Sequence, residues 1–328
     1  DLVRSRGLGD VYKRQPWSSE NGYVFVASTK TTAHFDISYT LDASSPDKTT
    51  QTYVDQIAAY LESSYTTLVS NWGYREGHRG LLQTRYQVSI KKLGAGIFGV
   101  TRPYVTGGTY VEISNYMTGW EGDSYYKSVL LGTAAHEYYH AIQDSYLGIF
   151  TITDPAPKWV VEGSGAWAEH EVYRQYFQTE TSGYDLAIFR SRMNEYLATP
   201  NLDISNEHSD NGYPSGLYWY FLADNTQINF SPGNPKRTVM RTLWEKLSSW
   251  GSWLLFTNNA INDALSASGY SLDTSFKVFT KANFFQSQWY PGSPEPSFNN
   301  VFQKAVAFTG ASVSYTSGTS SIPDIEHY

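Results

Sequence analysis

The chain has 328 residues, a formal net charge of −7 and no cysteine. A hydrophobic fraction of 41% is too high for a disordered chain, no segment has the apolar length of a membrane span, and the acidic balance argues against a nucleic-acid-binding protein. The lack of cysteine excludes disulfides, thiolate metal ligands and cysteine nucleophiles.

The two ends of the chain differ in character from the rest. Residues 6–15, RGLGDVYKRQ, resemble the translation of a sequencing adapter, so we interpret residues 1–15 as no part of the natural chain. Near the other end, the segment PGSPEP interrupts the helical patterns, and a polar Ser/Thr-rich linker follows. We therefore expect a C-terminal extension over residues 291–328, with the start of a further β domain as one interpretation.

Residues 16–126 are predicted to form an N-terminal lobe with a mixed sheet and one long helix. Apolar positions spaced by threes and fours predict the helix between residues 54 and 72. Asp47 or Thr49 can serve as its N-cap, and Gly73 stands where a helix-ending glycine belongs. Runs rich in β-forming residues predict four strands, at 23–26, 34–39, 85–91 and 110–114.

From residue 127 the pattern becomes helical, and residues 127–290 are predicted to form a mainly helical lobe. Gly, Pro and Asn separate its helices, which are predicted at 127–145, 162–178, 184–197, 214–224, 236–248, 257–268 and 272–284. A sheet lobe followed by a helical lobe is α+β organisation, in which the cleft between the lobes is the expected place for a site.

The segment HEYYH, residues 136–140, carries the clearest chemical signal. On a helix, residues four apart lie on one face, so the imidazoles of His136 and His140 can reach one ion. Neutral imidazoles suit Zn²⁺, which lowers the pKa of a coordinated water so that it can attack a carbonyl. Glu137 lies beside them and is placed to hold that water as general base rather than to bind the metal.

A catalytic zinc needs a third protein ligand and one open position. Glu162 is the favoured candidate, within the segment PKWVVEGSGAWAE that follows the HEYYH helix. His170 stands between two glutamates, and we interpret it as a solvated helix residue rather than a ligand. The rival carboxylates for the third position are Glu169, Glu171 and Asp144.

HEYYH and the downstream segment WVVEG together resemble the gluzincin zinc metallopeptidases, which include hyicolysin-type, peptidase-MA-like and aminopeptidase-like enzymes. The resemblance covers about residues 20–285, with its specific motifs in three short windows. It implies a zincin-like fold, with the metal-site helix at the cleft between the two lobes, and it implies Glu162 as the third zinc ligand. The small residues Gly163, Gly165 and Ala166 would let two helices approach closely at a shared metal.

The third window of the resemblance is NGYPSGLYWYFL, which is similar to the Y-x-x-G helix start of the family. It implies that Tyr213 donates a hydrogen bond to the developing oxyanion, a role that suits a phenol because it is neutral at pH 7. His208 is the alternative donor. The thermolysin-like branch has an Asp four residues after the ligand Glu, where this chain has Ala166; Glu169 could orient a ligand histidine instead.

These residues together predict a zinc-dependent peptidase acting on a protein or peptide substrate. The segment 107–113 could be the edge strand that pairs with a bound peptide. A composition rich in Tyr, Ser, Thr and Asn favours an extracellular or cell-surface location. The alternatives are a catalytically silent, zinc-containing adhesion or substrate-binding module, and a metal-dependent hydrolase of a non-peptide amide.

Overall fold

The computed structural model describes residues 28–147, 157–176, 192, 195–196, 204, 212–224, 235–249, 253–266 and 269–284. Several predictions from the sequence concern other residues. The strand at 23–26, most of the helix at 184–197, His208 and the two terminal segments 1–15 and 291–328 lie outside the described residues.

The described residues form an α+β fold, as the sequence predicts, with one five-stranded mixed sheet and seven α-helices among these segments. The strands are β1 (Ser28–Thr31), β2 (Phe35–Tyr39), β3 (Tyr86–Lys91), β4 (Gly99–Pro103) and β5 (Thr109–Ser114). The helices are α1 (Gln51–Tyr65), α2 (Ser124–Leu147), α3 (Lys158–Tyr176), α5 (Gly216–Asp224), α6 (Pro235–Ser249), α7 (Trp253–Ser266) and α8 (Leu272–Phe284). Predicted helices and strands in these segments agree with the observed ones except at their ends.

The strand order in the sheet is β1-β2-β3-β5-β4. The inner strands β2, β3 and β5 run parallel, and the outer strands β1 and β4 run antiparallel to their neighbours. The expectation that residues 107–113 form an edge strand is wrong, because β4 pairs with the outer side of β5. The strand β4 was not predicted from the sequence, because it is short and contains Gly99 and Pro103, two residues that strands disfavour away from sheet edges.

The N-cap of the long helix in the N-terminal region lies one residue after Thr49 and three after Asp47, the two predicted caps. Thr50 is the N-cap: its backbone is extended, and its Oγ1 accepts a hydrogen bond of 3.1 Å from the N–H of Tyr53. The alternatives are used elsewhere, since Asp47 accepts from the N–H of Lys92 at 2.8 Å. After α1 the chain continues as a π-helical turn, η2 (Thr66–Asn71), and Gly73 ends it with φ of +72°, as predicted.

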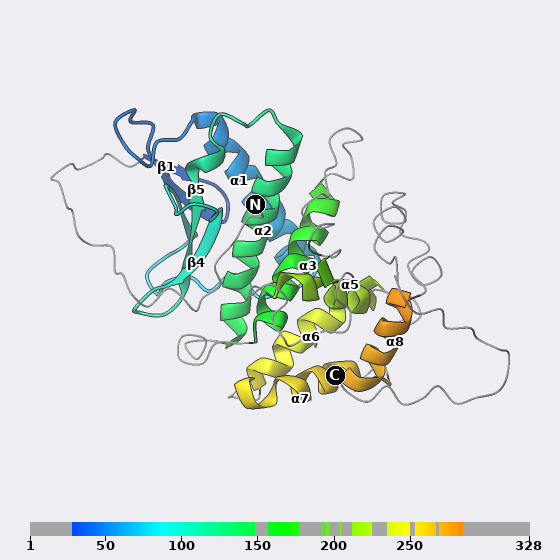
Figure 1. Ribbon diagram of the computed structural model, residues 1–328. Coiled ribbons are helices and arrows are strands. Elements are labelled where there is room, and N and C mark those ends of the chain that lie inside the picture. Colours follow the sequence, from blue (N-terminus) through cyan, green and yellow to red (C-terminus); the bar gives the residue numbers. More distant parts are fainter. Residues whose placement is uncertain are drawn as a thin grey trace, which may run out of the picture.

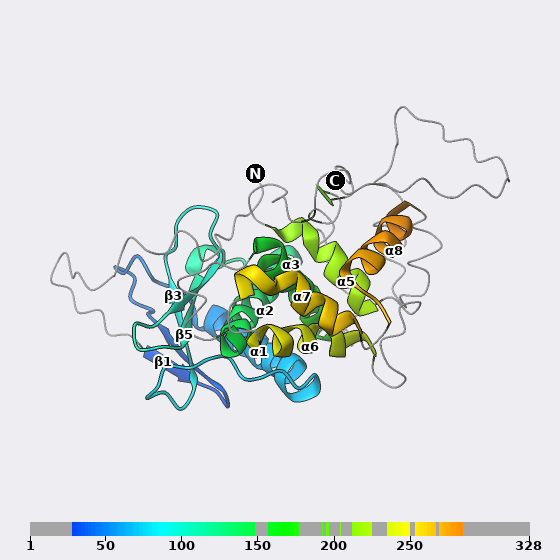
Figure 2. The same cartoon turned by 90° about the horizontal axis from the view of Figure 1, so that it is seen from below.

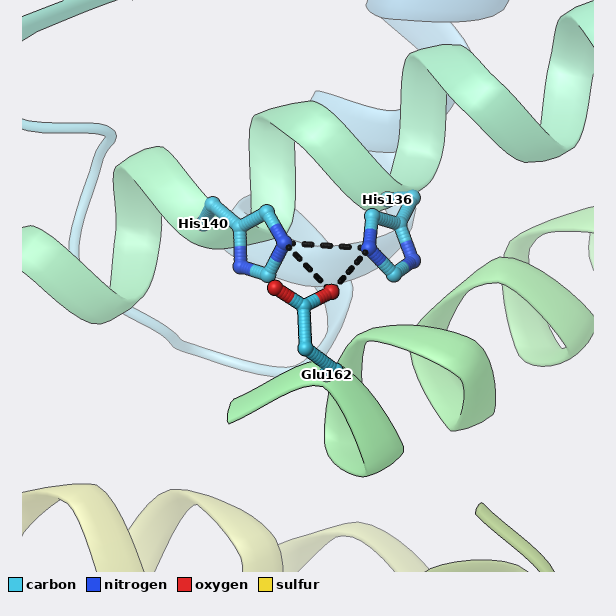
Figure 3. Close-up of side chains that lie close together, drawn as sticks. All are labelled: His136, His140 and Glu162. Carbon is cyan, nitrogen blue, oxygen red and sulfur yellow. Dashed lines mark hydrogen bonds and ion pairs between the residues drawn. The ribbon is translucent and has the colours of Figure 1, made fainter. Parts of the chain in front are cut away.

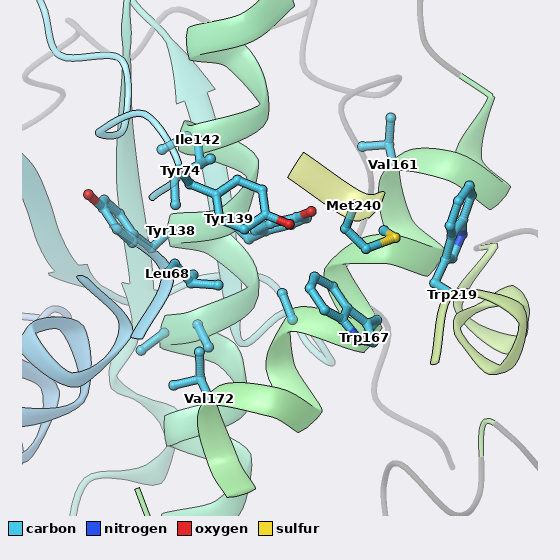
Figure 4. Packing of buried hydrophobic residues seen from close by; sticks show 14 of the residues in the cluster. Leu68, Tyr74, Tyr138, Tyr139, Ile142, Val161, Trp167, Val172, Trp219 and Met240 are labelled. Atoms are coloured by element: carbon cyan, nitrogen blue, oxygen red, sulfur yellow. The ribbon is translucent and has the colours of Figure 1, made fainter. Parts of the chain in front are cut away.

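Helices α2 and α3 lie between the sheet on one side and α5 to α8 on the other (Figures 1 and 2). Both helices are buried on nearly all sides, which is typical of a central helix. One cluster of buried apolar residues extends from Phe35 in β2 to Phe279 in α8, and its part around α2 and α3 is shown in Figure 4. The division into lobes at residues 126/127 stays a prediction; it falls within the first turn of α2.

None of the helices in the described segments is both long and apolar enough to cross a membrane. The feature of the fold that matters for chemistry is the contact of α2 with α3 on one side and with β4 of the sheet on another. The two predicted histidine ligands lie on the face of α2 that meets α3, and the predicted general base lies on the face that meets β4.

Candidate metal centre

Helix α2 carries His136, Glu137 and His140 in its buried middle, where each side chain is at most 7% exposed. The helix begins after Asp123, whose Oδ1 accepts hydrogen bonds from the N–H groups of Tyr125 and Tyr126 at 2.9 and 3.2 Å. The two histidines are one turn apart, and their Nε2 atoms lie 3.0 Å from each other (Figure 3).

Helix α3 brings Glu162 to the same point. Its Oε2 lies 3.1 Å from Nε2 of His136 and 3.4 Å from Nε2 of His140, so the three ligand atoms form a small triangle (Figure 3). A tetrahedral ion with ligand bonds of about 2.1 Å sets neighbouring ligand atoms about 3.4 Å apart. These three residues form a buried group that could hold a metal ion, and the identity of that ion stays a prediction.

Glycine allows α3 to approach α2 this closely. A Cβ on Gly165 would lie 2.7 Å from Cε1 of His136, and a Cβ on Gly132 of α2 would lie 2.6 Å from Oε1 of Glu169. On the far side of α3, a Cβ on Gly163 would lie 2.0 Å from Oγ of Ser215. The expectation that small residues permit the close approach is confirmed for Gly165; Gly163 instead allows close packing on Ser215, and the role of Ala166 stays a prediction.

The outer nitrogen of His140 is held by a neutral amide. Its Nδ1 lies 2.7 Å from Oε1 of Gln143, whose Nε2 donates to the carbonyl of Val161 at 3.1 Å and to Oγ of Ser164 at 3.0 Å. Because the amide oxygen only accepts, Nδ1 of His140 carries the proton, and the lone pair of Nε2 is free for a metal.

The outer nitrogen of His136 faces a carboxylate instead. Its Nδ1 is buried without a hydrogen-bond partner among the described residues, and Oε2 of Glu169 lies 3.6 Å away. That distance is longer than a hydrogen bond. The same carboxylate oxygen accepts from Arg192 at 2.5 Å. Glu169 therefore stands behind His136, as considered from the sequence, and Arg192 stands behind Glu169.

Glu137 contacts strand β4 of the sheet. Its Oε2 lies 2.8 Å from Oγ1 of Thr101 on β4, and the same hydroxyl is 2.8 Å from the backbone oxygen of Glu137. A Cβ on Gly99 would lie 2.6 Å from Cγ of Glu137, so β4 needs glycine at this position. Burial raises the pKa of Glu137, although the nearby histidines and Thr101 oppose that effect.

Tyr213 begins the short 3-10 helix η7 (Tyr213–Ser215), directly before α5. Gly212 precedes it with φ of +72° and packs so tightly that a Cβ would lie 2.6 Å from the backbone of Lys158. The ring of Tyr213 lies 5.4 Å from that of His136, and Cζ of Arg192 lies 4.4 Å above its centre. Burial holds the pKa of Tyr213 well above its usual value, so the phenol is neutral.

The electrostatics of the group favour a cation. Burial lowers the pKa of His136, yet the hydrogen bond to Glu162 and the nearby carboxylates of Glu169 and Glu137 outweigh this and raise it to about 10. Burial raises the pKa of Glu162, yet the two histidines hold it well below its usual range. A bound metal ion would displace the proton of His136; three ionised carboxylates (Glu137, Glu162 and Glu169) and the Arg192 guanidinium would then leave a net charge of −2, which a divalent cation would neutralise.

The rival ligands are engaged elsewhere. Asp144 lies 2.7 Å from Nδ1 of His78, and Glu171 lies 3.1 Å from Arg174. The interpretation of His170 as a solvated residue is wrong: it is 1% exposed, because α3 is covered on this face too, and its ring lies 5.3 Å from that of Tyr220.

Thr101, Gln143 and Arg192 were not singled out from the sequence. Gln143 lies three residues after His140, a helical spacing that could have indicated it; the other two are distant in sequence and gave no local signal. No protein-family model matches the chain, and comparisons with curated proteins and with solved structures gave no match. Function is therefore inferred from the geometry of the centre.

Proposed function

We propose that the chain is a zinc-dependent peptidase of gluzincin type with a zincin-like arrangement of sheet and helices. The observation that carries the proposal is the convergence of two imidazole nitrogens and one carboxylate oxygen on a single buried point, with a carboxylate of the same helix beside it. His136, His140 and Glu162 would hold the ion. Three protein ligands and an open position are typical of catalytic rather than structural zinc.

Each side chain around the centre has a role in peptide hydrolysis. Zn²⁺ held there would polarise the scissile carbonyl and acidify a water molecule. Glu137 would take the proton from the attacking water and pass it to the leaving amine. Its raised pKa suits this exchange, because a base and acid acts best near the working pH. Tyr213 would donate a hydrogen bond to the oxyanion, which a neutral phenol can do.

The edge of the sheet offers a place for an extended substrate. The N–H of Ser114 donates to the carbonyl of Phe98, and the N–H of Tyr104 donates to the carbonyl of Gly108. The backbone N–H and C=O groups of the even-numbered residues of β4 therefore point toward β5. The backbone N–H and C=O groups of Gly99 and Thr101 therefore point away from the described sheet, next to Glu137. A peptide strand added there would lie beside the centre, and Pro103, which has no N–H, would end the pairing.

Zinc content tests the ligands directly. Elemental analysis of the gel-filtered wild-type protein is expected to give about one zinc per chain, and Glu162→Ala is expected to lose most of it. Glu171→Ala is the matched control, because Glu171 is a buried glutamate of the same helix and a rival ligand. A folded wild-type protein without zinc, or equal loss in the two variants, would overturn the assignment.

Cleavage of casein, with a chelator as control, tests the chemistry. Glu137→Gln is expected to keep its zinc and to lose about 10²–10⁴-fold in turnover, because the general base is gone. Unimpaired cleavage by this variant would rule out the role of Glu137. A wild-type protein that binds zinc but cleaves no protein or peptide would instead favour the silent binding module.

A further inference from the structure

The mostly buried guanidinium of Arg192 contacts both Glu169, which lies behind the proposed ligand His136, and Tyr213, the proposed oxyanion donor. The side chain of Arg192 is 13% exposed and that of Glu169 15% exposed, and the two form an ion pair with 2.5 Å between Nη1 and Oε2. Burying such a pair costs each ion its hydration, so that an apolar pair of equal size is often no less stable. The location of the pair calls for an explanation other than stability.

The Glu169–Arg192 pair lies against His136 through Glu169 and against Tyr213 through Arg192. Glu169 presents Oε2, at 3.6 Å, to Nδ1 of His136, which has no hydrogen-bond partner among the described residues. The Cζ atom of Arg192 lies 4.4 Å over the ring of Tyr213, a distance at which a cation is attracted to an aromatic face. The rings of Tyr213 and His136 are themselves 5.4 Å apart. Four side chains thus form a closed ring beside the ligand triangle.

Space for the ring is provided by glycine. Gly132 lies one turn before His136 on α2, and a Cβ there would lie 2.6 Å from Oε1 of Glu169. Any larger residue would displace the carboxylate that faces the histidine. The position of Glu169 is therefore fixed from two directions, by the bare backbone of α2 and by Arg192.

We infer that Arg192 is a positioning residue of the centre, which fixes Glu169 behind the ligand His136 and at the same time fixes the ring of Tyr213. This inference rests on the proposed function. A carboxylate behind a ligand histidine sets which nitrogen carries the proton and orients the ring. Arg192 would thus fix the orientation of the His136 ring and that of Tyr213, the oxyanion donor, together. Arg192 itself would touch neither the metal nor the substrate.

Arginine is better suited than lysine to hold Glu169 and Tyr213 at the same time. Its planar group can bind a carboxylate through its edge while its face lies on an aromatic ring. Lysine has a compact ammonium group, which could keep the ion pair with Glu169 but could not cover the ring in the same way. Arg192→Lys and Arg192→Met therefore separate the charge from the shape, and the lysine variant also serves if Arg192→Met does not fold.

Metal affinity is the first readout, because it does not depend on turnover. In competition with a chromophoric chelator, Arg192→Met is expected to bind Zn²⁺ about 10–100-fold more weakly, the usual effect of losing a partner behind a ligand. The d–d absorption of the Co²⁺-loaded protein is expected to shift as His136 reorients. In a Glu169→Gln background, Arg192→Met is expected to add less than about twofold, because the two residues act through one chain of contacts.

Arg174→Met is the matched control. The side chain of Arg174 is also 13% exposed and pairs with Glu171 at 3.1 Å. Glu171 lies nine positions after Glu162, about two and a half helical turns, and so faces away from it. The control is expected to lower the unfolding temperature while leaving zinc affinity and the Co²⁺ spectrum within about twofold of wild type.

Turnover is the second readout, and it tests whether Arg192 also positions Tyr213. Arg192→Met is expected to lower kcat about tenfold beyond its effect on zinc occupancy, with KM little changed, and to add less than about twofold in a Tyr213→Phe background. An Arg192→Met protein that matches the Arg174→Met control in zinc affinity and Co²⁺ spectrum would overturn this inference alone. A folded wild-type protein that binds no zinc would overturn the proposed function together with it.

Discussion

The two histidines of the candidate centre are supported by different surroundings. On the side of His140, the supporting group is the neutral amide of Gln143 on the same helix, and its hydrogen bonds to α3 are complete. On the side of His136, the supporting group is the carboxylate of Glu169, which is bound by Arg192, and Nδ1 of the histidine has no hydrogen-bond partner in the part of the chain that the structure describes. One side is neutral and local; the other is charged and assembled from distant segments.

The difference indicates that the two sides of the site contribute unequally to stability and to metal binding. The His140 side resembles ordinary protein interior, in which each polar group has a partner, so it contributes stability whether or not a metal is present. The His136 side instead holds a charged pair, Glu169 and Arg192, and an outer nitrogen that has no hydrogen-bond partner among the described residues, so the ring is held less firmly before an ion binds at its Nε2. We therefore expect changes on the His136 side to affect metal binding more than changes on the His140 side.

The largest effect is expected from Gly165→Ala, on the His136 side. The new methyl group would lie 2.7 Å from Cε1 of His136, so that the ring or α3 must move and the ligand triangle must open. Zinc affinity, measured by chelator competition, is expected to fall about 100-fold. Gly122→Ala is the control, since a Cβ on Gly122 meets no atom within 4 Å; equal affinities in the two variants would contradict the prediction.

A smaller effect is expected from Gln143→Met, on the His140 side. The substitution keeps the shape of the side chain but removes the acceptor for Nδ1 of His140 and the donor to Val161. Zinc affinity is expected to fall about tenfold, and the free energy of unfolding of the metal-free protein by about 1–3 kcal/mol. If Gln143→Met weakened zinc binding more than Glu169→Gln, the contrast between the two sides would be reversed.

Thr101→Val should affect neither side of the metal, because Thr101 contacts Glu137 from the sheet. Zinc affinity is expected to stay within about twofold of wild type, while kcat falls about tenfold because the base loses the hydroxyl that holds it. Thr101→Ser keeps the hydroxyl and is expected to retain most of the activity. A loss of zinc in the valine variant would show that β4 supports the ligands as well as the base.

Much of the fold and of the ligand set follows from short-range patterns. The alternation in β3 and the spacing of apolar residues in α1 predict those elements because each buries one face. His136 and His140 are found for a similar reason, since a helix places residues four apart on one face. Glu162 was found by its sequence context, and the structure brings it to the two histidines.

The remaining features depend on tertiary contacts that no local pattern contains. The strand β4 has a weak pattern of its own and exists because β5 offers it a partner. Arg192 reaches the centre only because the chain returns to α3 after leaving it, and Thr101 because the sheet packs on α2. The burial of His170 likewise reflects how many elements cover α3, which its own sequence does not reveal.

The two tyrosines between the histidines set the rotational register of α2. Tyr138 packs against Phe35, with 5.0 Å between ring centres, and its hydroxyl accepts from the N–H of Gly77. Tyr139 points elsewhere and accepts from Nε1 of Trp244 at 2.7 Å. Figure 4 shows the two rings leaving α2 in different directions.

A helix held by two large side chains in different directions cannot turn about its axis without breaking contacts on both sides. The angular placement of the histidines is therefore fixed when the core forms, and the entropy of ordering them is lost during folding rather than during ion capture.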